Sequence, residues 1–194
     1  MNTRNYAADW EAARERTARL GLMVPAMEVP TGDSYLTIQR HGEFPYVIRD
    51  ALGELTVDDL VCQCLSINIR LRAVLEEWLG CPVYYTIGWV DVDAGEPLFK
   101  FDDAFIVEKL ASRDSGGEIG LHAWITLPSL EVIDVSLATS FAVLQNLKEG
   151  HGGVIAGAPD ALKGFAYRPM LVGADFLRKT GMLIEGSILT IERS

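Results

Sequence analysis

Cys64, His122 and Asp134 are the residues of this sequence whose types could together perform nucleophilic chemistry. A thiol attacks as the thiolate, and the partial positive charge at a helix N-terminus or a nearby imidazolium favours that form. An imidazole held by a carboxylate is fixed in one tautomer and can accept the thiol proton. The three residue types therefore predict a thiol nucleophile, a general base and a group that orients the base.

A hairpin is expected to bring His122 and Asp134 together. It joins two strand-like segments, LHAWITL and EVIDVS. A three-residue loop over 127–129 would pair Thr126 with Leu130 and set His122 directly opposite Asp134. Opposed residues have Cβ atoms about 4.5–5.5 Å apart on one face of a sheet. A slip of one residue would turn Asp134 to the other face, so the prediction depends on an odd loop length.

Cys64 begins the longest helical pattern, which runs to Leu79 and is closed by Gly80. Apolar residues at intervals of three and four indicate a buried helix face: Cys64, Ile67, Leu71, Val74 and Trp78. Cys62 would lie about 200° around the helix from Cys64 if the helix began earlier. We therefore expect Cys64 to face inward, and Cys62 is the alternative nucleophile.

The rest of the chain predicts an α+β fold in which N-terminal helices pack on an antiparallel sheet. Further helices are expected at 5–20, after a capping-box-like start at Thr56, at 104–112 and at 137–148. The expected strands are 35–39, 83–92, 97–101, 121–127, 131–136, 165–173 and 182–192. The remainder of 24–46, rich in Pro and Gly, predicts a loop.

No composition break or internal repeat divides the chain, so we expect one domain over 1–194. Within it, an N-terminal helix and irregular extension occupies 1–55. A catalytic core occupies 56–136, and a helix with closing strands occupies 137–194.

Composition excludes several classes of protein. The chain has 17 Lys and Arg against 27 Asp and Glu, and the resulting net charge of −10 repels phosphate groups. We therefore expect neither nucleic acid nor an anionic membrane surface as a partner. No stretch is long and apolar enough to span a membrane, and three cysteines are too few for a disulfide framework. A reducing cytoplasm is the expected setting.

The cysteines and the Gly-rich segment do not predict a bound cofactor. Cys62 and Cys64 are separated by one residue rather than the two that are usual in a zinc ligand pair, and no second ligand pair accompanies them. The segment GHGGVIAG at 150–157 lacks the Lys-Ser/Thr of a phosphate-binding loop. We expect neither a metal nor an organic cofactor.

Two segments resemble a known family. CLSINIRLRAVLEEWLGCPVYYTIGWV and LHAWITLPSLEVIDVS are similar to the core of the transglutaminase-like branch of the papain-like cysteine fold. The strand H-A-W followed by V-I-D is the most specific part of this resemblance, which covers Cys64 to Ser136. The resemblance implies Cys64 as nucleophile, His122 as general base and acid, and Asp134 as the group that orients His122.

The sequence departs from the family pattern near the same residues. The family often has Gly-x-Cys with a small residue four positions after the Cys, whereas this chain has Cys-Gln-Cys and Asn68. Val135 follows Asp134 where the family commonly has Pro. Two side chains, Gln39 and Gln63, are candidates for stabilising an oxyanion.

The resemblance implies thiol-dependent acyl transfer. Small members of the family generally hydrolyse amide bonds, so we expect a peptidase, amidase or deamidase that acts on a peptide, a protein or a small amide. One alternative is a catalytically inactive binding module with the same fold. Another is an arylamine N-acetyltransferase-like enzyme, although the sequence contains no recognisable acyl-CoA-binding region.

Overall fold

The structure is a computed structural model of the 194-residue chain and describes residues 5–27, 33–61, 63–93, 95–112 and 120–183. Within these residues, five strands form one antiparallel sheet in the order β4-β3-β2-β1-β5. The strands are β1 (Tyr84–Val92), β2 (His122–Thr126), β3 (Val132–Asp134), β4 (Ile155–Gly157) and β5 (Phe165–Val172). The expected α+β class and antiparallel sheet are confirmed.

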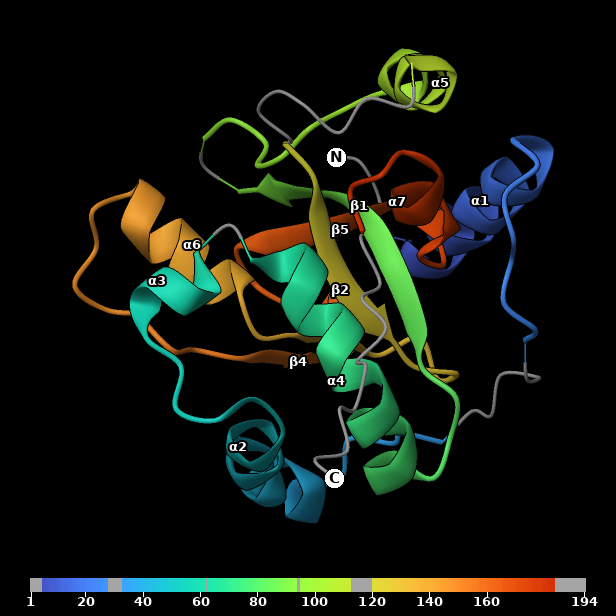
Figure 1. Ribbon diagram of the computed structural model, residues 1–194. Helices are drawn as coiled ribbons and strands as arrows, with labels where there is room; N and C mark the ends of the chain where they lie inside the picture. The colour runs from blue at the N-terminus through green and yellow to red at the C-terminus, as the bar shows by residue number, and fades with distance from the viewer. Residues whose placement is uncertain (1–4, 28–32, 62, 94, 113–119, 184–194) are drawn as a thin grey trace, which may run out of the picture.

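Helices cover both faces of this sheet (Figure 1). The helices are α1 (Tyr6–Arg19), α2 (Ile38–Leu52), α3 (Val57–Leu60), α4 (Cys64–Leu79), α5 (Asp103–Ser112), α6 (Leu137–Leu144) and α7 (Asp175–Lys179). α4 packs on β2 and β1 from one side, with α2 beside it, and α1 packs on the other side against β5. A 3-10 turn, Pro159–Ala161, precedes β5.

α4 is the helix whose bounds the hydrophobic spacing predicted correctly. It begins at Cys64 and ends at Leu79, where Gly80 adopts the left-handed conformation (φ 68°) that lets the chain leave the helix. Its buried positions are Cys64, Ile67, Asn68, Leu71, Leu75 and Leu79. Val74 and Trp78 are only half-buried, so the expected buried face is corrected at its C-terminal end.

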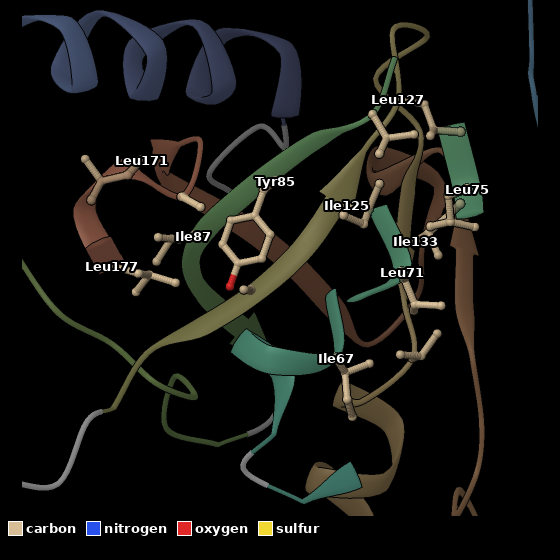
Figure 2. Close-up of a cluster of buried hydrophobic side chains, with 14 of the residues drawn as sticks. Ile67, Leu71, Leu75, Tyr85, Ile87, Ile125, Leu127, Ile133, Leu171 and Leu177 are labelled. Atoms are coloured by element: carbon tan, nitrogen blue, oxygen red, sulfur yellow. The ribbon is translucent and has the colours of Figure 1, made fainter. Parts of the chain in front are cut away.

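The buried face of α4 packs against the odd-numbered side chains of β1 and β2. Ile67, Leu71 and Leu75 contact a cluster that includes Tyr85 and Ile125 (Figure 2). Leu71 and Leu75 are completely buried. Truncating such a residue to alanine costs about 2–5 kcal/mol of unfolding free energy, so this packing fixes where the helix begins relative to β2.

α1 is anchored to the opposite face of the sheet by polar contacts as well as by packing. The expected amphipathic helix is confirmed, and Asn5 caps it by accepting a hydrogen bond from Ala8 N at 3.1 Å. The Tyr6 hydroxyl lies 2.7 Å from Thr126 Oγ1, and Trp10 Nε1 donates to Thr86 Oγ1 at 3.3 Å. These buried contacts join α1 to both central strands.

The sequence predicts a loop and a short strand between 24 and 46. This prediction is wrong from Ile38 onward, where α2 begins. Thr37 caps this helix by accepting from Arg40 N at 3.3 Å, and the helix continues through Pro45. Proline removes one backbone hydrogen bond, but Phe44 is buried on this helix. Trp78 Nε1 of α4 also donates to Glu43 at 3.2 Å. Tertiary contacts with α4 therefore outweigh the local helix-breaking signals.

Several other expectations are confirmed or corrected. The capping box at Thr56 is present, with Asp59 as its second member. The expected strand 97–101 is reduced to one bridge between Leu98 and Val90. The expected helix 137–148 ends at Leu144, and the Gly-rich connection contains β4. The late strand expected at 182–192 lies almost wholly outside the described residues.

Candidate active site

Asp134 is held at the end of β3 by the turn that follows it. Its Oδ1 accepts hydrogen bonds from the backbone N–H groups of Ser136 and Leu137, each at 3.0 Å. The Ser136 hydroxyl adds a third bond to the same oxygen at 3.1 Å. Burial raises the pKa of Asp134, but His122 and these backbone donors outweigh burial and lower it below its usual range. The carboxylate is therefore fixed and ionised.

The other oxygen of Asp134 holds His122. Oδ2 lies 2.5 Å from His122 Nε2, and the two side chains are 0% and 1% exposed. Such a bond fixes the imidazole so that Nδ1 is left to act on a neighbouring group. The structure thus brings together the two residues that the sequence predicted as base and orienting group.

The register that brings them together differs from the expected one. β2 pairs with β3 through Ile125 and Ile133, and Leu127 N donates to Glu131 O at 2.9 Å, so the loop is 128–130. The predicted loop at 127–129 is therefore wrong by one residue. Asp134 lies diagonal to His122, but its face is unchanged because the loop length is still odd.

Cys64 reaches the site from the first residue of α4. Its side chain is 5% exposed, and the thiol donates to the carbonyl oxygen of Leu121 at 3.5 Å. Leu121 immediately precedes His122, so the start of α4 lies beside the start of β2. Cys64 is a free cysteine. The expectation that Cys64 faces inward is confirmed.

Asn68 fixes the start of α4 against β2. Its Nδ2 donates to Cys64 O at 2.8 Å and to Ala123 O at 2.9 Å. Two carbonyl acceptors require the amide nitrogen at this position, which settles the orientation of the side chain. The Oδ1 atom is buried without a hydrogen-bond partner. Asn68 thus connects the helix of Cys64 to the strand of His122.

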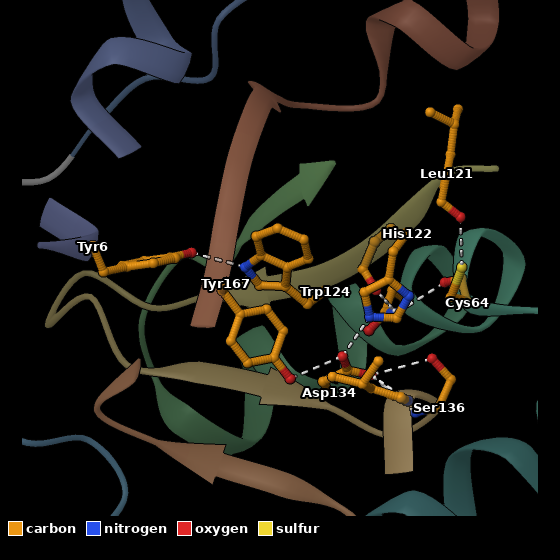
Figure 3. A network of polar contacts seen from close by, with 11 residues as sticks. Tyr6, Cys64, Leu121, His122, Trp124, Asp134, Ser136 and Tyr167 are labelled. Atoms are coloured by element: carbon orange, nitrogen blue, oxygen red, sulfur yellow. Dashed lines mark hydrogen bonds and ion pairs between the residues drawn. The ribbon is translucent and has the colours of Figure 1, made fainter. Parts of the chain in front are cut away.

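The free nitrogen of His122 faces Cys64. Nδ1 is buried without a hydrogen-bond partner, and the imidazole ring lies between Asp134 and Cys64 (Figure 3). Burial lowers the pKa of His122, but the charges and hydrogen-bonding groups of Asp134 and Cys64 outweigh it and raise the pKa to about 10. His122 is therefore protonated at neutral pH and can stabilise a negative charge on the sulfur.

Aromatic side chains enclose the imidazole. Phe99 stacks on His122 with ring centroids 5.2 Å apart, and Trp124 lies 5.8 Å away on the same strand. Phe99 has a positive φ of 59°, which is unusual for a residue other than glycine. These rings exclude water from the His122–Asp134 bond and so strengthen its electrostatics.

Gly88 leaves the space that Trp124 occupies. It pairs directly with His122 across β1 and β2, at a bulge between β1 and β5. A Cβ at this position would lie 2.1 Å from Arg168 O and 2.6 Å from the Trp124 ring. Only glycine therefore fits beside the site at this strand position.

Tyr167 is a site residue that the sequence reasoning missed. Its hydroxyl donates to Asp134 Oδ2 at 3.0 Å, and its ring lies 4.9 Å from that of Trp124. The strand pattern at 165–173 predicted β5, but nothing in that pattern indicates which strand β5 adjoins. Tyr167 could not be placed near Asp134 without that strand order.

The remaining sequence candidates lie elsewhere or outside the described residues. Cys62 is outside the described residues, so its position relative to His122 is not defined. Gln39 is exposed on α2 and donates to Glu43 at 2.7 Å. Gln63 precedes Cys64 and accepts from Ser66 Oγ at 3.1 Å. Among the described residues, no three His, Cys, Asp or Glu side chains gather in a way that could hold a metal ion.

Comparison with known proteins gives no relative. No family model, no curated protein and no solved structure matches this chain. Separately, no helix within the described ranges is both long and apolar enough to cross a membrane.

Proposed function

We propose that the protein catalyses thiol-dependent acyl transfer, most simply the hydrolysis of an amide bond, with Cys64 as nucleophile, His122 as general base and acid, and Asp134 as the residue that orients His122. The observation that carries this proposal is the buried imidazole, bonded to a carboxylate through Nε2 and facing a thiol through its unpartnered Nδ1. A buried charged pair is costly to maintain, and its position beside a helix-start cysteine gives it a chemical use.

The reaction follows from these positions. The thiolate of Cys64, stabilised by the protonated His122, attacks the carbonyl carbon of the substrate. The imidazolium gives its Nδ1 proton to the amide nitrogen as the C–N bond breaks, which releases an amine and leaves an acyl thioester on Cys64. The neutral His122 then accepts a proton from water as the water attacks the thioester, and the sulfur leaves as the thiolate beside the restored imidazolium while the carboxylic acid is released.

The tetrahedral intermediate carries a negative oxygen that needs donors. The first N–H groups of α4 have no partner within the helix, and they lie at the same end as Cys64. Gln63 is the nearer in sequence of the two side-chain candidates. We propose that the helix start supplies the oxyanion site.

The substrate class is a peptide, a protein or a small amide. A cavity of about 460 Å³ lies between the start of α5 and Gly120, lined by Lys100, Phe101, Asp102, Phe105 and Gly120. Gly120 lies two residues before His122, and we propose this cavity as the place where a substrate side chain binds. The chemistry requires no cofactor and needs the thiol reduced, as in the cytoplasm.

We also propose that the chain has a transglutaminase-like, papain-like core. Three positions support this: a helix that begins at Cys64, an H-A-W strand that begins at His122, and a V-I-D strand that ends at Asp134. Asn68, four residues after Cys64, departs from the pattern, and here it has a defined structural contact.

One observation favours a catalytically inactive binding module instead. Cys64 is only 5% exposed, and its thiol donates to the Leu121 carbonyl at 3.5 Å. In an inactive protein this bond would be the whole role of the thiol. The buried, unpartnered Nδ1 of His122 is the feature that this alternative does not explain.

The proposal can be tested with p-nitrophenyl acetate, a small activated acyl donor. We expect a burst of nitrophenol and a transient acetyl group on Cys64 in the intact mass. Cys64→Ser should show neither, and His122→Ala should acylate at least about tenfold more slowly. A folded native protein with no burst and no adduct would support the binding module and contradict the proposal.

A further inference from the structure

Tyr167 contacts the site from the far edge of the sheet. It lies on β5, whereas Asp134 lies on β3, and β1 and β2 separate these strands. Its side chain reaches across that face of the sheet to place the hydroxyl 3.0 Å from Asp134 Oδ2 (Figure 3). Tyr167 is 2% exposed, so the contact is sheltered from water.

The two oxygens of Asp134 have different partners. Oδ1 takes its three hydrogen bonds from the turn at Ser136 and Leu137. Oδ2 takes its two from His122 and Tyr167. The turn therefore anchors the carboxylate, and Tyr167 competes directly with His122 for the oxygen that holds the imidazole.

We propose that Tyr167 is a positioning residue of this site, which acts on His122 through Asp134 by sharing the carboxylate oxygen that binds the imidazole. The inference rests on the proposed function and adds a residue to it. By drawing part of the Oδ2 charge, the Tyr167 hydroxyl weakens the stabilisation that Asp134 gives to the positive imidazolium through Nε2. The imidazolium is then a stronger acid and gives its Nδ1 proton more readily to the leaving amine.

The surroundings of Tyr167 keep its hydroxyl protonated, so that it remains a hydrogen-bond donor to Asp134. Burial and the charge of Asp134, with a smaller contribution from Tyr6, raise the pKa of Tyr167 well above its usual range, so the hydroxyl keeps its proton. The titratable groups around the Asp134–His122 pair are Cys64 from α4, Tyr167 from β5 and Tyr6 from α1. None of these is a positive charge that could take over the role of Tyr167.

Tyr6 supplies a matched control. Its buried hydroxyl accepts from Trp124 Nε1 at 2.7 Å and contacts Thr126, so it lies in the same cluster without a hydrogen bond to Asp134. Tyr6→Phe and Tyr167→Phe each remove one buried tyrosine hydroxyl at nearly constant volume. A merely structural role predicts the same outcome for both variants.

The test is an NMR titration of the imidazoles of the native protein and the two variants. The chain has three histidines, so the His122 signal can be identified by its loss in His122→Ala. We expect Tyr167→Phe to move the His122 midpoint upward by about 0.5 pH unit, because Asp134 Oδ2 then bonds His122 alone. Tyr6→Phe should leave the midpoint in place.

An unchanged His122 midpoint in Tyr167→Phe, or an equal shift in both variants, would overturn the positioning role. That outcome differs from failure of the proposed function. If Tyr167 has no effect, acetylation of Cys64 by p-nitrophenyl acetate still depends on His122. If the proposed function itself is wrong, that acetylation is absent in the native protein, and Tyr167 then has no reaction to assist.

Discussion

Asp134 holds His122 from a diagonal position on the neighbouring strand, with Oδ2 2.5 Å from Nε2. Neither side chain is more than 1% exposed, so water compensates neither charge. The pKa of His122 is raised to about 10, against the effect of burial, and that of Asp134 is lowered. Each charge therefore depends on the other, and this dependence gives the site its first measurable properties.

Asp134→Asn should remove the carboxylate charge that pairs with the imidazole. Only Cys64 then opposes the effect of burial, so the pKa of His122 should fall well below about 10. Loss of one partner from a buried pair should cost about 3–5 kcal/mol of unfolding free energy. Urea unfolding and an imidazole titration measure the two effects.

Asp91→Asn, which disrupts a more exposed pair with Arg168, is the control and should change stability by less than about 1 kcal/mol. A variant whose His122 still titrates at the native pH would contradict the pairing.

The stability of the native protein should depend on pH through His122. Its folded pKa is raised from 6.5 to about 10, so its contribution is complete below pH 6.5 and is lost as the pH rises toward 10. Asp134 has a lowered pKa, so its contribution is lost only as the pH falls below its usual 3.8.

Urea unfolding at intervals from pH 6 to pH 10 should show a decline in stability that Asp134→Asn reduces. The exposed His41→Gln variant should keep the native slope. An identical slope in Asp134→Asn and the native protein would contradict the assignment.

The pairing of His122 and Asp134 could be predicted because side-chain alternation in a strand has a period of two. The predicted loop lies one residue too early in the chain, and the predicted opposition of His122 and Asp134 is wrong. Both registers nevertheless leave Asp134 on the same face as His122. The bounds of α4 were predictable for a similar reason, since Gly80 and the apolar spacing agree.

Gly88→Ala should disrupt the sheet beside the site. The added Cβ would lie 2.1 Å from a backbone oxygen of β5, and that strand would have to move. Overpacking of this kind costs about 1–3 kcal/mol or more, and displacement of Trp124 toward His122 should also slow acylation of Cys64. Thermal or urea unfolding measures the loss. Gly120→Ala is the matched control, because a Cβ there meets nothing within 4 Å. Equal stability of the two variants would show that Gly88 has no packing role.

Asn68→Ala should loosen the start of α4. The variant loses both Nδ2 hydrogen bonds and leaves the Ala123 carbonyl without this partner, at a cost of about 1–3 kcal/mol. Because Cys64 is then less firmly held beside Leu121, its acylation should slow as well. Ser66→Ala removes an exposed hydroxyl from the same turn and should change stability by less than about 0.5 kcal/mol. Native rates and stability in Asn68→Ala would contradict the bridging role.

Tyr167 and α2 show where sequence patterns stop being informative. Tyr167 reaches Asp134 only because β5 returns beside β1, and alternation within a strand carries no information about strand order. α2 contains Gly42 and Pro45, which locally predict a loop, and its helix depends on contacts with α4. Both features come from tertiary contacts between segments far apart in the chain.

Selective alkylation is the most direct test of the claim that His122 activates Cys64. The native protein is treated briefly with iodoacetamide at mildly acidic pH, and the labelled cysteines are located by mass spectrometry. The labelling of Cys62 and Cys81 is recorded in the same sample for comparison. We predict that Cys64 is labelled first and that His122→Ala slows this labelling at least about tenfold, because the imidazolium no longer stabilises the thiolate. Equally slow labelling of all three cysteines, or preferential labelling of Cys62, would contradict the account.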